Sequence, residues 1–173
     1  MSIAPFLERI NTFIFDVDGV LTDGYVLVLE NGLQARRMNI KDGYALQLAV
    51  KKGYRLVILS GAPVSPVVDR LNKLGITEVY MGIHDKKEFI TSYIRQHDLL
   101  KDELLFMGDD IPDLDAMEVT GLSACPADAV PEILEVAKYV SPIPGGNGCV
   151  RDVIEMVMKI QGKWKHQNDI ASR

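Results

Sequence analysis

A short apolar run that ends in two spaced acids constrains this sequence more than any other stretch. Residues 13–15 are Phe-Ile-Phe, and Asp16-Val-Asp-Gly19 follows them directly. The apolar run favours a buried strand, and in extended backbone Asp16 and Asp18 project from the same face. Two carboxylates at the end of a buried strand are costly unless they are paired or bind a metal. A solvated turn is the ordinary interpretation of this motif taken alone.

Apolar strands and amphipathic helices alternate along the rest of the chain. Further strands are predicted at residues 55–59, 78–81, 104–107 and 122–125, with helices at residues 1–11, 42–52, 63–74, 86–97, 112–119, 131–137 and 149–161. This alternation predicts an α/β, Rossmann-like fold, in which helices cover both faces of a parallel sheet. With 173 residues and no linker or internal repeat, the chain is expected to form a single domain over residues 1–173.

Two segments stand outside this alternation. Residues 24–40 are predicted to form a β-hairpin, because a Tyr-Val-Leu-Val-Leu run precedes the tight-turn pair Asn31-Gly32. Such a hairpin is too small and too apolar to stand alone in water, so we expect it to pack against another element or a partner subunit. The polar tail, about residues 162–173, is expected to be mobile.

Composition narrows the function classes. The net charge of −5 argues against a nucleic-acid binder, which would present a basic face. No stretch is long and apolar enough to span a membrane, and the N-terminal residues lack the apolar core of a signal peptide. Cys125 and Cys149 have no metal-ligand spacing, so free thiols are favoured over one disulfide. These features favour a cytoplasmic protein that binds neither nucleic acid nor membrane.

Four unusual segments each follow an apolar strand. They are Asp16-Val-Asp18, Ser60-Gly61, the loop that leads to Lys86, and Gly108-Asp-Asp110. In open α/β sheets ligands bind beyond the carboxyl ends of the strands, so the fold would gather these segments in one crevice. A carboxylate there could attack phosphorus, and a second could protonate the leaving oxygen and then activate water. A lysine and Mg²⁺ would offset the phosphate charge.

The order of these motifs resembles the haloacid dehalogenase superfamily of phosphohydrolases. The resemblance implies that Asp16 is the nucleophile and Asp18 the general acid/base. It also implies that Ser60, Gly61 and Lys86 bind the phosphoryl group. Mg²⁺ would be held by the side chain of Asp16, the backbone carbonyl of Asp18, and Asp109. Two further acids would orient Lys86 or the metal-bound waters, namely Asp110 and Asp113.

Ordinary structural roles stay open for several of these residues. Lys86 could be a solvated residue at the start of a helix, and Ser60 could belong to a turn. Asp110 and Asp113 could simply cap and charge the helix that follows them.

A narrower resemblance covers nearly the whole chain. The runs at residues 16–24, 39–44, 69–70, 108–110 and 145–152 are similar to those of the 3-deoxy-D-manno-octulosonate 8-phosphate (KDO 8-phosphate) phosphatases. That family acts in lipopolysaccharide precursor synthesis, lacks a cap domain, and forms tetramers through the hairpin. The resemblance therefore implies a homotetramer whose neighbouring subunit and C-terminal tail help to close each active site. The implied substrate contacts are Asn39, Lys41, Asp42, Gly43, Arg70 and Lys86, with Asp18.

The sequence departs from the family pattern at two positions. Ala62 follows the Ser60-Gly61 pair, at a position where well-known bacterial members have an arginine. Gln47 occupies a second position at which those members often have an arginine. Arg70 is the best candidate to bind the sugar acid's carboxylate bidentately, and its alternative role is an exposed helix cation paired with an acid. Lys73, three positions along the same helix, could compensate for the lost arginines.

Three other functions stay open at this point. The same chemistry could act on a nine-carbon 9-phosphate, such as KDN 9-phosphate or sialic acid 9-phosphate, because sister enzymes differ around Ala62. The chain could also be a non-catalytic partner of a sugar-activating enzyme, although it retains every predicted chemical residue. A response-regulator-like phosphorylated switch is disfavoured, because Asp18 supplies an acid/base two residues after Asp16.

Overall fold

One six-stranded sheet forms the centre of the molecule in this computed structural model, which describes residues 3–166 and 170. The strand order is β5-β4-β1-β6-β7-β8, and all neighbouring strands run parallel. The strands are β1 Thr12–Phe15, β4 Arg55–Ser60, β5 Glu78–Met81, β6 Leu104–Met107, β7 Leu122–Cys125 and β8 Tyr139–Val140. The predicted parallel α/β sheet is therefore confirmed. The sequence did not predict β8, because a pair of residues is too short to show a period.

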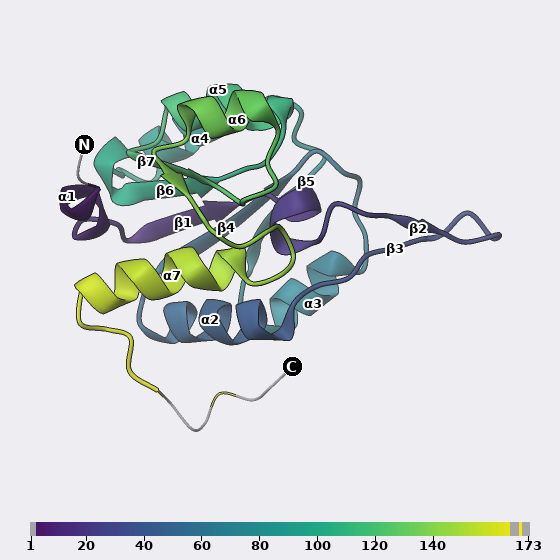
Figure 1. Cartoon of the computed structure of the whole chain (residues 1–173), viewed down its shortest axis with the longest axis horizontal. Helices are drawn as coiled ribbons and strands as arrows, with labels where there is room; N and C mark the ends of the chain where they lie inside the picture. Colours follow the sequence, from purple (N-terminus) through teal and green to yellow (C-terminus); the bar gives the residue numbers. More distant parts are fainter. Residues whose placement is uncertain (1–2, 167–169, 171–173) are drawn as a thin grey trace.

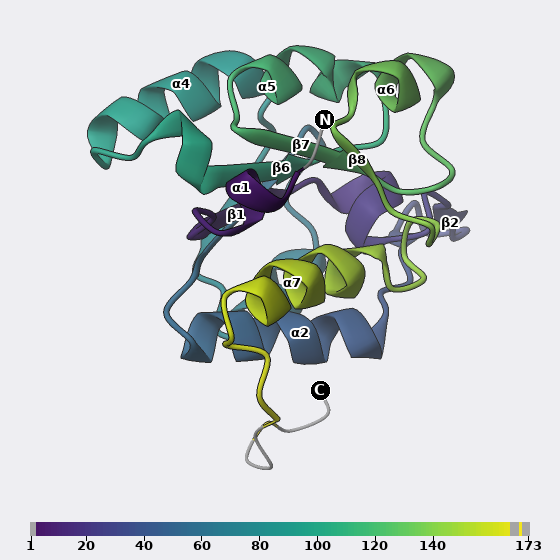
Figure 2. The same cartoon turned by 60° about the vertical axis from the view of Figure 1, so that its left-hand side comes forward.

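Helices cover the sheet on both faces, as Figures 1 and 2 show. The longer helices α2 (Ile40–Lys51) and α7 (Cys149–Ile160) lie side by side on one face with α3 (Val67–Lys73). The opposite face carries α4 (Lys86–Gln96), α5 (Leu114–Glu118) and α6 (Pro131–Val136), and α1 (Ala4–Leu7) lies at the N-terminus.

Strand β1 shows why a continuous apolar run belongs here. Phe13 and Phe15 pack into the core beneath α2 and α7, whereas Ile14 packs into the core beneath α4, α5 and α6. Alternate side chains of a strand point to opposite faces, so a central strand with both faces covered needs apolar residues at every position. The two cores hold β1 rigidly and fix the position of the acids that follow it.

Helix α3 begins later than the sequence predicted. The expected helix started at Pro63, but the structure begins it at Val67 with Pro66 as the preceding residue. A helix begun at Pro63 would require Pro66 to donate a backbone hydrogen bond, and proline has no N–H. The prediction of the helix start was therefore wrong by about one turn.

The hairpin segment extends away from the body of the molecule (Figure 1). Its strands β2 (Leu27–Val28) and β3 (Gln34–Ala35) pair antiparallel, and the bridge between Thr22 and Met38 closes its base. Leu27 and Leu33 are each 63% exposed, so this chain alone does not cover the hairpin's apolar side chains.

The predicted mobile tail falls partly outside the described residues. Within the part that the structure describes, Trp164 packs edge-on against Tyr44, with ring centroids 6.3 Å apart, and the Arg151 guanidinium lies over the Trp164 ring. In the same described ranges, we find no helix with the length and apolarity needed to cross a membrane.

Candidate active site

The two acids of the opening motif lie where β1 gives way to an irregular turn, η1 (Val17–Leu21). Asp16 follows the last strand residue and is 7% exposed. Gly19 has φ +88°, a backbone conformation that glycine adopts without strain. A methyl group at Gly19 would also stand 2.7 Å from Oδ1 of Asp109 and closer still to its other oxygen. Glycine therefore lets the Asp109 carboxylate lie directly against the turn that carries Asp16 and Asp18.

The four predicted segments meet in one cleft of about 430 Å³ at the carboxyl edge of the sheet. Its lining includes the predicted residues Asp16, Asp18, Ser60, Gly61, Lys86, Asp109, Asp110 and Asp113. Residues that the sequence did not single out for the site also line it, among them Gly24, Ile83, His84 and Pro112. Parallel strands bring these segments together because their carboxyl ends share one edge.

Lys86 is the buried cation of the cleft. Its Nζ lies 2.9 Å from Oδ1 of Asp16 and 2.6 Å from Oδ1 of Asp113, and the side chain is 4% exposed. Burial by itself would lower the pKa of Lys86, but the neighbouring carboxylates of Asp16 and Asp113 outweigh burial and raise it. Lys86 therefore stays charged while it faces the predicted nucleophile. An exposed helix-start lysine would show neither contact.

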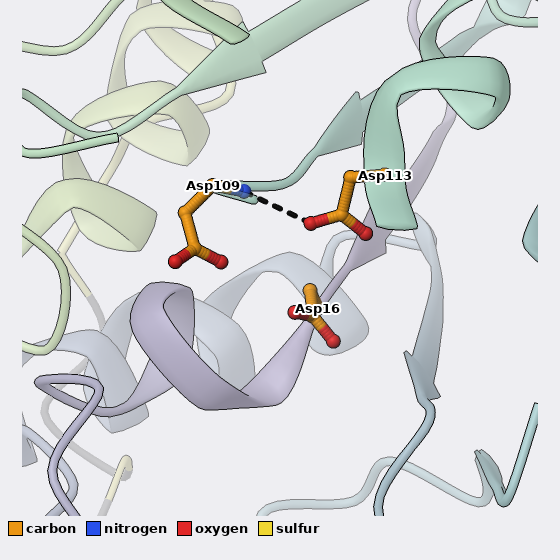
Figure 3. Close-up of side chains that lie close together, drawn as sticks. All are labelled: Asp16, Asp109 and Asp113. Atoms are coloured by element: carbon orange, nitrogen blue, oxygen red, sulfur yellow. Dashed lines mark hydrogen bonds between the residues drawn. The ribbon is translucent and has the colours of Figure 1, made fainter. Parts of the chain in front are cut away.

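Asp110 precedes the short turn η3 (Ile111–Asp113) and Asp113 ends it, and the two acids have different surroundings. Asp113 is 1% exposed, contacts Lys86, and accepts a hydrogen bond of 3.0 Å from the backbone N–H of Asp109 (Figure 3). Asp110 is exposed, and its carboxylate accepts a 2.7 Å hydrogen bond from the N–H of Ile111. Asp113 thus holds both Lys86 and the backbone at Asp109, whereas Asp110 caps the turn.

Three carboxylates surround one space, as Figure 3 shows for Asp16, Asp109 and Asp113. One oxygen from each lies within 4.8 Å of the others. Burial, followed by the charges of Asp16 and Asp113, raises the pKa of Asp109 to about 8. Burial, followed by the negative charge of Asp113, raises the pKa of Asp16 to about 6.

Asp109 also has a buried Oδ1 without a hydrogen-bond partner among the described residues. Carboxylates crowded in this way repel one another, and a divalent cation with oxygen ligands would relieve that repulsion. The donor set therefore fits Mg²⁺.

Arg36, which follows β3 of the hairpin, binds Asp18. Its Nε lies 2.6 Å from Oδ1 and its Nη2 lies 3.3 Å from Oδ2, and the Arg36 side chain is 10% exposed. The sequence does not indicate this contact, because only the path of the hairpin brings these two residues, 18 positions apart, together. The predicted acid/base is therefore tied to the hairpin.

Known proteins are similar to this chain over most of its length. The haloacid dehalogenase-like hydrolase family matches residues 75–151. The 3-deoxy-D-manno-octulosonate 8-phosphate phosphatase of Escherichia coli (strain K12) is 36% identical over 156 residues, which cover 90% of this chain and 83% of that protein. This chain belongs to the KDO 8-phosphate phosphatase family. The resemblance stated from the sequence motifs is confirmed.

Solved structures of this family have the same fold. The KDO 8-phosphate phosphatase of Yersinia pestis has a TM-score of 0.90 at 32% identity, over 93% of this chain and 87% of that one. The Moraxella catarrhalis enzyme, solved in complex with magnesium ion, phosphate ion and KDO, has a TM-score of 0.90 at 29% identity, over 94% of this chain and 93% of that one.

The substrate contacts implied by the family lie mostly outside the cleft of this single chain. Arg70 lines a second hollow, of about 370 Å³. Arg36 also lines this second hollow, and because it binds Asp18 it connects the hollow to the active-site cleft. Lys41 lines a separate groove beside α7, and Lys73 is exposed on α3. Ala62 lines the cleft itself.

The start of α2 contacts the loop before α7. Asn39 accepts a 2.8 Å hydrogen bond from the N–H of Lys41 and donates one of 3.4 Å to the carbonyl of Gly146. Asp42 is 2% exposed and accepts a 2.7 Å hydrogen bond from the N–H of Arg151, and Gly43 is buried beside it. A substrate role for these residues stays a prediction.

Proposed function

We propose that this protein is a Mg²⁺-dependent phosphomonoesterase that hydrolyses KDO 8-phosphate to KDO and phosphate. The observation that carries the proposal is the convergence of Asp16, Asp18, Lys86 and Asp109 in one cleft of a chain that belongs to this family. The reaction passes through an aspartyl-phosphate on Asp16, which divides a difficult hydrolysis into two easier steps.

The residues of the cleft have separate tasks in this proposal. Asp16 attacks phosphorus, while Lys86 and the hydroxyl and N–H groups at Ser60-Gly61 offset the charge on the phosphoryl oxygens. Asp18 gives a proton to the leaving sugar oxygen and then takes one from the water that attacks the aspartyl-phosphate. Asp113 keeps Lys86 in place.

Mg²⁺ would be held by the side chains of Asp16 and Asp109 and the carbonyl of Asp18. When bound, it supplies positive charge that brings an anionic nucleophile and a phosphate dianion together.

The direct test of this function is phosphate release from KDO 8-phosphate by the purified chain, measured with Mg²⁺ and with excess EDTA. We expect Mg²⁺-dependent turnover that EDTA abolishes. Equal rates in both conditions would contradict the metal requirement. The absence of turnover with Mg²⁺ would contradict the function and favour a binding module that retains the motifs.

A nine-carbon sugar acid 9-phosphate is the second candidate substrate, because Ala62 leaves the cleft without the arginine that well-known bacterial members place there. The values of kcat/KM for KDO 8-phosphate and KDN 9-phosphate would separate the two. Preference for the eight-carbon acid supports the proposal, and preference for the nine-carbon acid keeps the mechanism but reassigns the substrate.

Arg70→Ala should weaken binding of the sugar acid without changing the chemistry. We expect KM for KDO 8-phosphate to rise about 10-fold or more while kcat stays within about threefold, because a charged hydrogen bond to the carboxylate is lost. Steady-state kinetics with p-nitrophenyl phosphate, which has no such carboxylate, should show little change. Arg95→Ala, on the exposed face of α4, is the matched control. An equal loss on both substrates would contradict this role.

The raised pKa values of Asp16 and Asp109 predict how stability depends on pH. In the cation-free protein these carboxyls keep protons that the unfolded chain has released, so their contribution to the free energy of unfolding falls as pH rises from about 4 to about 8. Saturating Mg²⁺ should remove much of this fall, because it favours the ionised carboxylates.

Urea unfolding with EDTA or Mg²⁺ across that range measures the effect. Asp109→Asn should make the EDTA curve flatter. The same dependence on pH in Asp109→Asn and in the wild type, both with EDTA, would contradict the prediction.

We also propose that the protein is a cytoplasmic homotetramer, as the family resemblance implies, and the exposed hairpin supports association with a partner subunit. The hairpin's apolar side chains are exposed in this chain, including Tyr25 at 79% and Val28 at 68%. A partner subunit would cover them, and Arg36 would connect that interface to Asp18. Sedimentation of wild type and of a Leu27→Glu, Val28→Lys double variant would test this assembly.

A further inference from the structure

The loop before α7, residues 144–148, lies against the turn that carries the predicted nucleophile. The N–H of Gly146 donates a 2.9 Å hydrogen bond to the carbonyl of Val20, and the Cys149 thiol donates to the same carbonyl at 3.3 Å. In Figure 1 this loop curls beside the turn η1, at the N-terminal end of α7. The two segments are more than a hundred residues apart in sequence.

Gly145 makes the closest approach. It is buried, and a methyl group there would stand 2.7 Å from the carbonyl carbon of Gly19 and closer still to its oxygen. Gly19 is also close to Asp109, because a methyl group on Gly19 would meet the Asp109 carboxylate. The Gly19 backbone therefore contacts both the Gly145 backbone and the Asp109 carboxylate. A Cβ on Gly145 would have to displace either its own loop or the Gly19 peptide, because the atoms that it would meet are backbone atoms.

Other contacts fix the loop itself. The N–H of Gly145 donates a 2.8 Å hydrogen bond to Oδ1 of Asp128, and the side chain of Asn147 donates one of 2.7 Å to the carbonyl of Gly145. Asn39 at the start of α2 donates to the carbonyl of Gly146. The loop is thus held from outside by Asp128 and Asn39, and from within by Asn147.

We propose that Gly145 is a positioning residue for the cleft, which sets the place of the Asp18–Gly19 peptide against Asp109. This inference rests on the proposed function, because it takes the Asp18 carbonyl and Asp109 as parts of the metal site. The loop acts through Gly19 and does not itself touch the substrate. Residues that orient metal ligands commonly change metal affinity by about 10- to 100-fold when they are mutated.

Gly145→Ala is the test, and Gly121→Ala is its matched control. Gly121 is also buried, and a methyl group there would stand 2.6 Å from the Asp102 Cα. It precedes β7, so it lies at the opposite edge of the sheet from the cleft. Neither glycine has a positive φ. Both variants therefore force apart closely packed backbone segments, but only Gly145→Ala does so at the turn η1, which contains Asp18 and Gly19.

The first measurement is the Mg²⁺ concentration that gives half of the maximal rise in unfolding temperature, without substrate. We expect Gly145→Ala to raise it about 10-fold or more, while Gly121→Ala keeps it within about twofold even if its unfolding temperature falls. The second is hydrogen exchange of residues 17–22, which should be faster only in Gly145→Ala, because the N–H of Thr22 bonds to the carbonyl of Val17 within this turn. Equal effects of the two substitutions on both measurements would overturn the proposal.

Asp128 offers a gentler variant if Gly145→Ala fails to fold. Asp128 is exposed, so Asp128→Ala removes the hydrogen bond to Gly145 without a steric clash. It should weaken Mg²⁺ binding about threefold or more, and Asp128→Asn, which keeps an acceptor, should restore it. Unchanged Mg²⁺ affinity in Asp128→Ala would contradict the positioning role. If the wild type binds Mg²⁺ but hydrolyses neither sugar acid, the proposed function fails alone, because these binding and exchange measurements still decide the role of Gly145.

Discussion

Asp16→Asn is expected to lose at least about 10³-fold in kcat, because an amide oxygen cannot form the aspartyl-phosphate. Asp16 is the first residue after the rigid strand β1, and its Oδ1 lies 2.9 Å from Nζ of Lys86. The measurement is the rate of phosphate release with Mg²⁺. The variant should remain folded, because asparagine has nearly the same shape and the buried site loses a charge that it must otherwise neutralise.

Asp115→Asn is the matched control for this substitution. It makes the same chemical change at an exposed position, two residues after Asp113 in the sequence. We expect it to keep wild-type kcat. Substantial turnover in Asp16→Asn, in protein free of contaminating phosphatase, would rule out Asp16 as the nucleophile.

Lys86→Met is the second large effect, and it should reduce both activity and stability. The substitution leaves Asp16 and Asp113 buried without their cation, and removing one partner from a buried pair costs about 3–5 kcal/mol. The lost positive charge also raises the pKa of Asp16 further, so less of the nucleophile is ionised near neutral pH. We expect kcat to fall by about 10²-fold or more.

Lys87→Met, one residue along, provides the control. Lys87 is paired with Glu118 at the surface, where such pairs contribute little to stability. Urea unfolding at about pH 6 and about pH 8 should show that Lys86→Met is destabilised more at the higher pH, because its native state holds the carboxyl protons more tightly. Similar stabilities of the two variants at both values would contradict the account of the buried lysine.

The sequence indicates most of the fold because patterns along the chain repeat at the periods of strands and helices. The apolar run before Asp16 and the regular alternation that follows leave few arrangements other than a parallel α/β sheet. The same topology explains why segments that follow separate strands lie in one cleft. The predicted start of α3 was wrong because the apolar pattern alone does not show that Pro66 lacks the N–H that a helix begun at Pro63 would need.

The contacts that the sequence did not indicate are set by packing between distant segments. Arg36 reaches Asp18 only because the hairpin folds back. Gly145 meets Gly19 only once α7 lies beside α2. A glycine-rich run by itself indicates a loop and does not say which backbone it will contact. The roles of Arg70, Lys41 and Asp42 in substrate binding stay predictions for the same reason.

The measurement that tests the central claim most directly is the mass of the Asp18→Asn variant after reaction with p-nitrophenyl phosphate and Mg²⁺ and an acid quench. The nitrophenolate leaves without a proton, so Asp16 can still be phosphorylated, but hydrolysis of the aspartyl-phosphate is slow without Asp18 as base. We predict one added phosphoryl group on the peptide that contains Asp16, and no lasting adduct on the wild type. A long-lived adduct on the wild type would indicate a phosphorylated switch. Phosphate release without any adduct, or an adduct on another residue, would contradict Asp16 as the nucleophile.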